Sequence, residues 1–69
     1  MRVSDVEALR NWLDRIDCLP GYQADLIDDA IWNLERGNDY RAEDSLKTMA
    51  RNYRNNGDSN AADAVERLL

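Results

Sequence analysis

The chain has 69 residues, with 14 acidic and nine basic side chains, a net charge of −5 and no histidine. A chain this short forms one small domain and lacks the volume for a deep catalytic cleft with a cofactor site. The missing histidine and the single cysteine exclude histidine-based catalysis and zinc sites built from these two residues, and the acidic charge disfavours general binding of nucleic acids.

The only cysteine, Cys18, excludes an internal disulfide. A small domain without disulfides is typical of a reducing compartment, so we expect a cytoplasmic protein. The N-terminal residues are polar rather than signal-like, and no apolar run is long enough to span a membrane. We therefore expect no membrane association.

A first helix is predicted to begin at Ser4, because Ser4 and Glu7 have the spacing of a capping box. Residues 19–21, Leu-Pro-Gly, are expected to end it. Trp12 lies at the edge of its apolar stripe. The stripe itself follows helical spacing and comprises Val6, Leu9, Leu13 and Ile16.

A second helix is predicted over residues 22–36, followed by Gly37 as its C-terminal stop. Asp39 is the expected N-cap of the next helix. Its apolar stripe comprises Ile27, Ala30, Ile31 and Leu34.

A third helix is predicted over residues 40–55 and a short fourth over residues 60–69. The stripe of the third comprises Ala42, Leu46, Met49, Ala50 and Tyr53, and that of the fourth comprises Ala61, Val65 and Leu68. No segment alternates with period two. The predicted fold is therefore all-α, a compact bundle of about four short helices that pair as antiparallel hairpins within one domain, residues 1–69.

The turns after the second and third predicted helices repeat each other at a spacing of 20 residues, as Gly37-Asn38 and Gly57-Asp58. The second copy, Ala50-x-x-Tyr53-x-x-x-Gly57-Asp58-x-x-x-Ala62, resembles part of a tetratricopeptide repeat. The resemblance covers less than one repeat, whose period in that family is 34 residues, and Glu66 stands where the family has a large apolar residue. It implies a helix–turn–helix hairpin and no peptide-binding residues.

Trp32 is the leading candidate for a binding residue. It lies about 160° around the second helix from Leu34, on a polar side. Tryptophan is a frequent anchor at protein interfaces, so this side is predicted to bind another helix, a second subunit or a partner protein. An incidentally exposed tryptophan is the remaining explanation. Its charged neighbours on the helix are Asp25, Asp28, Asp29, Glu35 and Arg36.

The row of carboxylates allows a second interpretation. Neighbouring helix positions lie about 5–6 Å apart, a spacing that can imitate a row of phosphates. A solvated acidic face is the simplest explanation of such a row. The same carboxylates match no calcium-binding loop, and we expect no metal site, cofactor or catalytic residue.

A secondary basic face is predicted on the third helix, formed by Lys47, Arg51 and Arg54. Arginine reads base edges in helix-turn-helix proteins. Cations near a helix C-terminus also complement the helix dipole, which is a purely structural role. An internal or intersubunit match to the acidic first half is a further explanation.

The leading functional hypothesis is a small non-enzymatic protein-binding module that inhibits or modulates a partner protein. In size and style the chain resembles the small inhibitors that phages direct against host proteins. The alternatives are an acidic nucleic-acid mimic, such as an anti-CRISPR or anti-restriction protein, and a small helix-turn-helix DNA binder. A homodimer is also expected, because apolar residues remain beyond a single small core, notably Trp12, Trp32 and Leu69.

Overall fold

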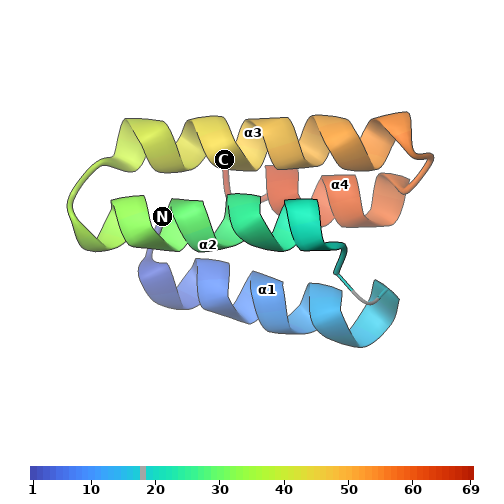
Figure 1. The fold of residues 1–69 in the computed structure, drawn as a ribbon, viewed down its shortest axis with the longest axis horizontal. Coiled ribbons are helices and arrows are strands. Elements are labelled where there is room, and N and C mark those ends of the chain that lie inside the picture. The colour runs from blue at the N-terminus through green and yellow to red at the C-terminus, as the bar shows by residue number, and fades with distance from the viewer. Residues whose placement is uncertain (18) are drawn as a thin grey trace.

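The structure, a computed structural model, describes residues 1–17 and 19–69, so Cys18 lies outside the described residues. Its helices are α1 (Val3–Asp17), α2 (Gly21–Glu35), α3 (Asp39–Asn55) and α4 (Ser59–Glu66). Consecutive helices run antiparallel (Figure 1). The all-α bundle of four short helices predicted from the sequence is confirmed.

The start of α1 differs from the predicted capping box. The helix begins at Val3 rather than at Ser4. The Arg2 backbone N–H donates to the Asp5 carboxylate at 3.3 Å, so Asp5 performs the role expected of Glu7. In a capping box, an acid in the first turn accepts a hydrogen bond from the N–H of the N-cap residue. Asp5 makes this bond two residues before the predicted Glu7, and the bond does not require a hydroxyl side chain at the N-cap.

The two repeated turns have the same backbone geometry. Gly37 and Gly57 adopt φ of 78° and 80°. In each turn the following residue donates to the carbonyl five positions back at 2.8 Å, Asn38 to Asn33 and Asp58 to Tyr53. This Schellman motif ends a helix at a left-handed glycine, which explains the 20-residue repeat in the sequence.

The ends of α3 and α4 differ by a few residues from the prediction. Asn38, not Asp39, is the N-cap of α3, because the Schellman turn is complete after two residues. Asp39 lies in the first helical turn, where an acid complements the dipole. After α4, Leu68 and Leu69 donate to carbonyls three residues back, so the chain tightens into a turn and the helix ends at Glu66.

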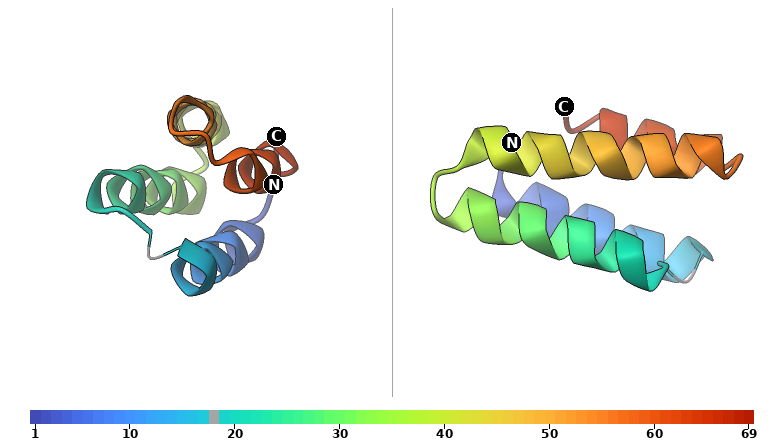
Figure 2. Two further views of the ribbon diagram at one scale, coloured as in Figure 1. Left: turned by 90° about the vertical axis from the view of Figure 1, so that its right-hand side faces the viewer. Right: turned by 45° about the horizontal axis from the view of Figure 1, so that its top comes forward.

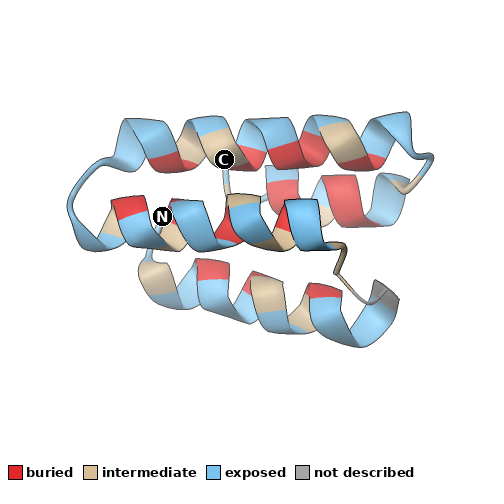
Figure 3. Ribbon diagram, in the orientation of Figure 1, coloured by how far each residue is buried: buried red, intermediate tan, exposed pale blue. Residues whose placement is uncertain are grey.

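The core runs along the inner faces of the four helices (Figure 3). All five residues of the predicted α3 stripe are buried, while Ile31 and Leu34 of α2 are only half-buried. The buried apolar residues are Val6, Leu9, Leu13, Ile27, Ala30, Ala42, Leu46, Met49, Ala50, Tyr53, Ala61, Ala62 and Val65. The radius of gyration, 10.7 Å, is close to the value of about 11 Å for a folded chain of this length.

Polar side chains join α2 to α3. The buried Gln23 donates through Nε2 to the Met49 carbonyl at 3.0 Å and accepts from Asn52 Nδ2 at 3.2 Å. Nearby, Asn56 Nδ2 donates to the Tyr22 hydroxyl at 2.8 Å. These bonds fix the register of the two helices, because each tolerates little sliding.

The first helix is the least enclosed element. In the end-on view, α1 lies below both α2 and α4, on the side of the bundle away from α3 (Figure 2). Ile16, predicted to lie in the core, is 47% exposed. It lies in the last turn of α1 and faces an open groove between α1 and α4 rather than a packed neighbour.

Candidate functional site

Trp32 lies in the C-terminal half of α2 and is 50% exposed. The neighbouring Ile31 and Asn33 turn toward the protein, being half-buried and buried respectively. A large aromatic residue therefore stands on the outer surface of the helix, as its position relative to the apolar stripe predicts. Exposed aromatic residues of this kind supply most of the binding energy in many protein interfaces.

Arg36 holds the Trp32 ring. Its guanidinium carbon lies 3.7 Å from the ring centroid, and its Nη1 donates to the Trp32 carbonyl at 2.9 Å. The first contact is a cation–π interaction and the second satisfies a carbonyl of the last helical turn. Arg36 therefore both orients the exposed ring and caps the helix.

The carboxylates of the predicted acidic row differ in whether they form ion pairs or hydrogen bonds within the protein. Asp28 Oδ1 accepts from Arg10 Nε at 2.9 Å, and Arg10 Nη1 also lies 3.6 Å from Asp14. Asp25 and Glu35 are exposed and form no ion pair or hydrogen bond with the described side chains. Only part of the acidic row is therefore free to meet a partner.

Asp29 is the most tightly held of these acids. Its Oδ2 accepts from Ser45 Oγ at 2.8 Å and from Asn33 Nδ2 at 3.1 Å. The bond to Ser45 crosses from α2 to α3. Asp29 is thus partly a structural residue, which sequence reasoning did not distinguish from its neighbours.

Two shallow hollows border Trp32. The first lies along α2 and is lined by Asp25, Asp28, Asp29 and Trp32. The second lies between α2 and α3 and is lined by Asp29, Trp32, Asn33, Arg41, Asp44 and Ser45. Trp32 and Asp29 line both hollows. We call the residues of both hollows, with Arg36, the Trp32 surface.

The predicted basic face is brought together on α3, but it is partly neutralised. Lys47, Arg51 and Arg54 line one hollow with Glu66 and Leu69. Arg54 donates to Glu66 and, at 2.8 Å, to Asp63. Its hydrogen bonds to Glu66 first, and then to Asp63, raise the pKa of Arg54. An internal match to the acidic first half, one of the explanations left open for the basic face, does not hold for Arg54, because its partners lie on α4.

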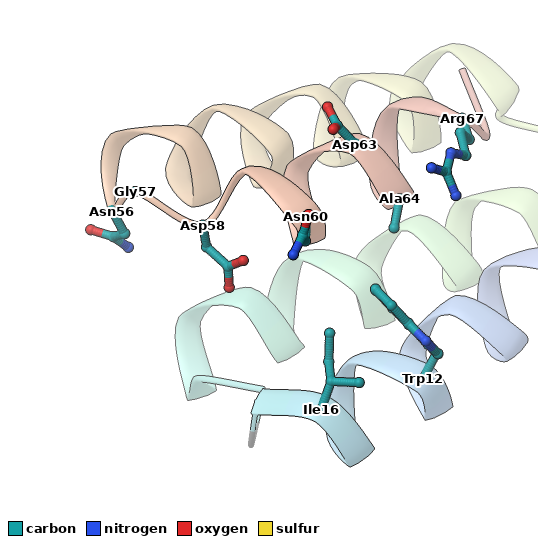
Figure 4. Close-up of a pocket in the computed structure, with 9 residues that line it drawn as sticks. All are labelled: Trp12, Ile16, Asn56, Gly57, Asp58, Asn60, Asp63, Ala64 and Arg67. Atoms are coloured by element: carbon teal, nitrogen blue, oxygen red, sulfur yellow. The ribbon is translucent and has the colours of Figure 1, made fainter.

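A groove between α1 and α4 was not predicted as a site. Its volume is about 630 Å³, and Trp12 and Ile16 form its α1 side. Figure 4 shows these two side chains pointing toward Asn60 and Ala64 of α4, with Asp58 and Arg67 farther along the groove. The position of Trp12 at the edge of the apolar stripe was the only sequence signal for it.

In comparisons with known proteins, no family model, curated protein or solved structure matches the chain. Among residues 1–17 and 19–69, no helix is long and apolar enough to cross a membrane. Among the side chains that the structure describes, which leave out those of residues 17 and 18, no three acidic groups lie close enough together to hold a metal ion. The interpretation of the site therefore depends on its own geometry.

Asn33 is a feature of the site that sequence reasoning missed. Its side chain is 3% exposed, and its Nδ2 donates to the carbonyl and the carboxylate of Asp29. Its Oδ1 is buried and has no hydrogen-bond partner among the described residues. An unmatched buried acceptor of this kind costs about 1–3 kcal/mol. The sequence gives no signal for this, since asparagine next to charged residues is typical of a solvated face.

Proposed function

We propose that the chain is a small non-enzymatic protein-binding module that docks on a partner protein through the Trp32 surface. The observation that carries the proposal is the half-exposed Trp32 ring, held by Arg36 and bordered by two hollows. A ring fixed before binding loses little conformational entropy on docking. Hollows beside it offer complementary positions for a partner's side chains.

The partner we propose carries basic residues around an apolar contact. The exposed Asp25 and Glu35 lie on the same helix as Trp32 and would face such residues. Complementary charge speeds association and excludes acidic proteins. The consequence of docking is inhibition or modulation of the partner, as in the small phage inhibitors that the chain resembles in size. The single cysteine supports placing this function in the cytoplasm.

A nucleic-acid mimic is the second candidate. The exposure of Asp25, Asp28 and Asp29 along one helix favours it. Against it, Asp28 is paired with Arg10, and Asp29 accepts two hydrogen bonds within the fold. A row of phosphates is imitated best by carboxylates that are free to pair with the partner's cations. The engagement of two of the three therefore favours the Trp32-centred mode.

A helix-turn-helix DNA binder receives less support. In such proteins the two helices cross at about 90–120°, whereas α2 and α3 lie side by side and antiparallel (Figure 1). Arg54 of the basic face is engaged by Asp63 and Glu66. A guanidinium already bound to two carboxylates is poorly available to a phosphate or a base.

We further propose that two copies associate through the groove between α1 and α4. Ile16 is 47% exposed there and lies beside the half-buried Trp12. Packing Ile16 and Trp12 against a second copy would remove their apolar surface from water. A domain this small cannot cover all of its apolar surface by itself. Sedimentation of the wild type and of Ile16→Glu tests this, because a dimer that uses the groove is converted to a monomer by the charge.

The docking proposal is tested by capturing partners from nuclease-treated lysate with the wild-type chain and with Trp32→Ala. We expect loss of the specific partner with Trp32→Ala. The matched control is Tyr40→Ala, because Tyr40 is an aromatic residue at 76% exposure that lies outside the Trp32 surface. Equal loss with both variants, or no loss with Trp32→Ala, contradicts the proposal.

The same captured partner separates the alternatives. Replacing Asp25, Asp28 and Asp29 with asparagine abolishes binding by a mimic, which duplex DNA also displaces and salt weakens steeply. A Trp32-centred complex tolerates salt better and is not displaced by DNA. A DNA binder shifts a labelled duplex directly, and Arg51→Ala prevents the shift.

A further inference from the structure

The hollow between α2 and α3 combines features that recognise one kind of group. Trp32, two acids and one basic residue line it with two polar residues, namely Asp29, Asn33, Arg41, Asp44 and Ser45 beside Trp32. Asp44 is exposed and forms no ion pair or hydrogen bond with the described residues. An aromatic ring beside carboxylates is a setting that attracts a cation.

The orphaned oxygen of Asn33 is an independent sign of a missing ligand. Both Nδ2 hydrogen bonds go to acceptors of Asp29, its carbonyl at 2.9 Å and its carboxylate at 3.1 Å. A flipped amide would place oxygen against oxygen, so the orientation of the amide is determined. Oδ1 therefore lacks a donor, and Asn33 is one of the residues that line the hollow.

We propose that this hollow binds an arginine side chain of the partner protein. The guanidinium is planar and carries five N–H donors, which suit the carboxylate of Asp44, the Oδ1 of Asn33 and the Oδ1 of Asp29, the carboxylate oxygen that Asn33 and Ser45 leave unbonded. Its flat face also packs on an indole ring. The inference rests on the proposed function, because it names the side chain that docks beside Trp32.

Lysine fits the hollow less well. Its ammonium is a compact, strongly hydrated charge without a flat face, so it gains less from the Trp32 ring and from acceptors that are spread around the hollow. The chain's own Arg41 lines the same hollow and is exposed, without an ion pair or hydrogen bond to the described residues. Its charge opposes an entering cation, so its removal is expected to tighten binding.

The direct test titrates the ¹⁵N-labelled chain with N-acetyl-arginine amide and follows side-chain N–H resonances. We expect saturable shifts of the Trp32 indole N–H and the Asn33 side-chain amide. The Trp12 indole N–H is the internal reference, because Trp12 lies in the groove between α1 and α4. Two analogues serve as controls. The citrulline analogue keeps the planar shape of the arginine head group without its charge, and the lysine analogue keeps the charge without a planar group.

Three variants sharpen the titration. Asp44→Asn is expected to weaken arginine binding about three- to tenfold, the range of a charge-assisted hydrogen bond at a partly exposed site. Arg41→Gln is expected to strengthen it. Glu7→Gln is the matched control, because it removes one acid from an exposed position of α1 outside the hollow. All three substitutions are at exposed positions that the core does not use.

The proposal is overturned if citrulline or lysine analogues bind as tightly as arginine, if the shifts do not saturate, or if Asp44→Asn and Glu7→Gln have equal effects. Partner capture then separates the two proposals. If Trp32→Ala loses the partner and Asp44→Asn leaves the affinity for the partner unchanged, docking stands and the arginine site is wrong. If the arginine analogue binds but Trp32→Ala still captures the partner, the site stands and the docking proposal is wrong.

Discussion

The guanidinium of Arg36 lies over the Trp32 ring at 3.7 Å and bonds the carbonyl of the same residue at 2.9 Å. The two residues are four positions apart on α2, which is the spacing at which helical side chains meet. One arginine therefore holds the candidate anchor and the last turn of its helix together. The exposed ring is positioned by the chain itself rather than by the partner.

Replacing Arg36 should affect binding more than stability. In Arg36→Ala we expect partner affinity to fall about threefold to tenfold, since the lost cation–π contact is worth about 0.5–1 kcal/mol at an exposed site and the freed ring must be ordered on docking. Calorimetric titration of the captured partner measures this. Arg36→Lys is the control that keeps the positive charge. If its affinity for the partner equals that of Arg36→Ala, the loss is due to the missing planar guanidinium over the Trp32 ring and not to the missing charge.

The buried Gln23 should be important for stability. Gln23→Ala removes a side chain that is 0% exposed and its bonds to Met49 and Asn52. We expect the free energy of unfolding to fall by about 2–4 kcal/mol, from the lost hydrogen bonds and the cavity together. Urea unfolding followed by circular dichroism gives the value. A loss no larger than that of the half-buried Asn52→Ala would show that the Gln23 contacts contribute little.

The fold was predictable from the sequence where apolar spacing is regular and where glycine or proline follows the end of a helix, as after α1, α2 and α3. All five apolar positions of the predicted α3 stripe are buried because this helix contacts both α2 and α4. Ile16 obeyed the same spacing but is exposed, since burial also requires a neighbour opposite the last turn of α1. The spacing of apolar residues indicates which face of a helix can be buried. It does not indicate where the neighbouring helix ends.

The candidate site was predicted in part. The exposure of Trp32 follows from helical geometry, and so does the proximity of Asp28, Asp29 and Arg36. The internal partners of Asp28 and Asp29 do not, because Arg10 and Ser45 lie on other helices. Buried Gln23 and Asn33 were missed for a related reason: a polar residue is identified as core only when its bonding partner is known.

Stability should be constant across the neutral pH range. The chain has no histidine, the side chain that ordinarily titrates there. The pKa of Arg54 is raised by Glu66 and Asp63. The stability linked to a raised pKa is complete below the unfolded value and is lost only as the pH rises through the folded value, far into alkali.

We therefore expect the free energy of unfolding to differ by less than about 1 kcal/mol between about pH 5.5 and about pH 7.5, less than a one-unit pKa shift would cause. Urea unfolding at the two pH values measures it. A larger change would contradict this expectation.

Alanine at the three glycines should have effects of opposite sign. Gly37 and Gly57 adopt positive φ, whereas Gly21 begins α2. An added Cβ meets no atom within 4 Å at any of the three, so packing does not contribute and the backbone alone decides. Gly37→Ala and Gly57→Ala should each lower the free energy of unfolding by about 1–2 kcal/mol, the cost of a left-handed L-residue.

Gly21→Ala should instead raise it by about 0.5–1 kcal/mol, because alanine restricts the unfolded chain and fits the helical conformation. Urea unfolding of the three variants under one set of conditions gives the comparison. Asparagine at position 37 or 57, which tolerates positive φ better than alanine, should recover part of the loss. If all three alanine variants lose stability equally, the effect of alanine does not depend on the backbone conformation of the glycine that it replaces. The left-handed glycines of the two Schellman turns would then not be needed to stabilise the α2–α3 and α3–α4 hairpins.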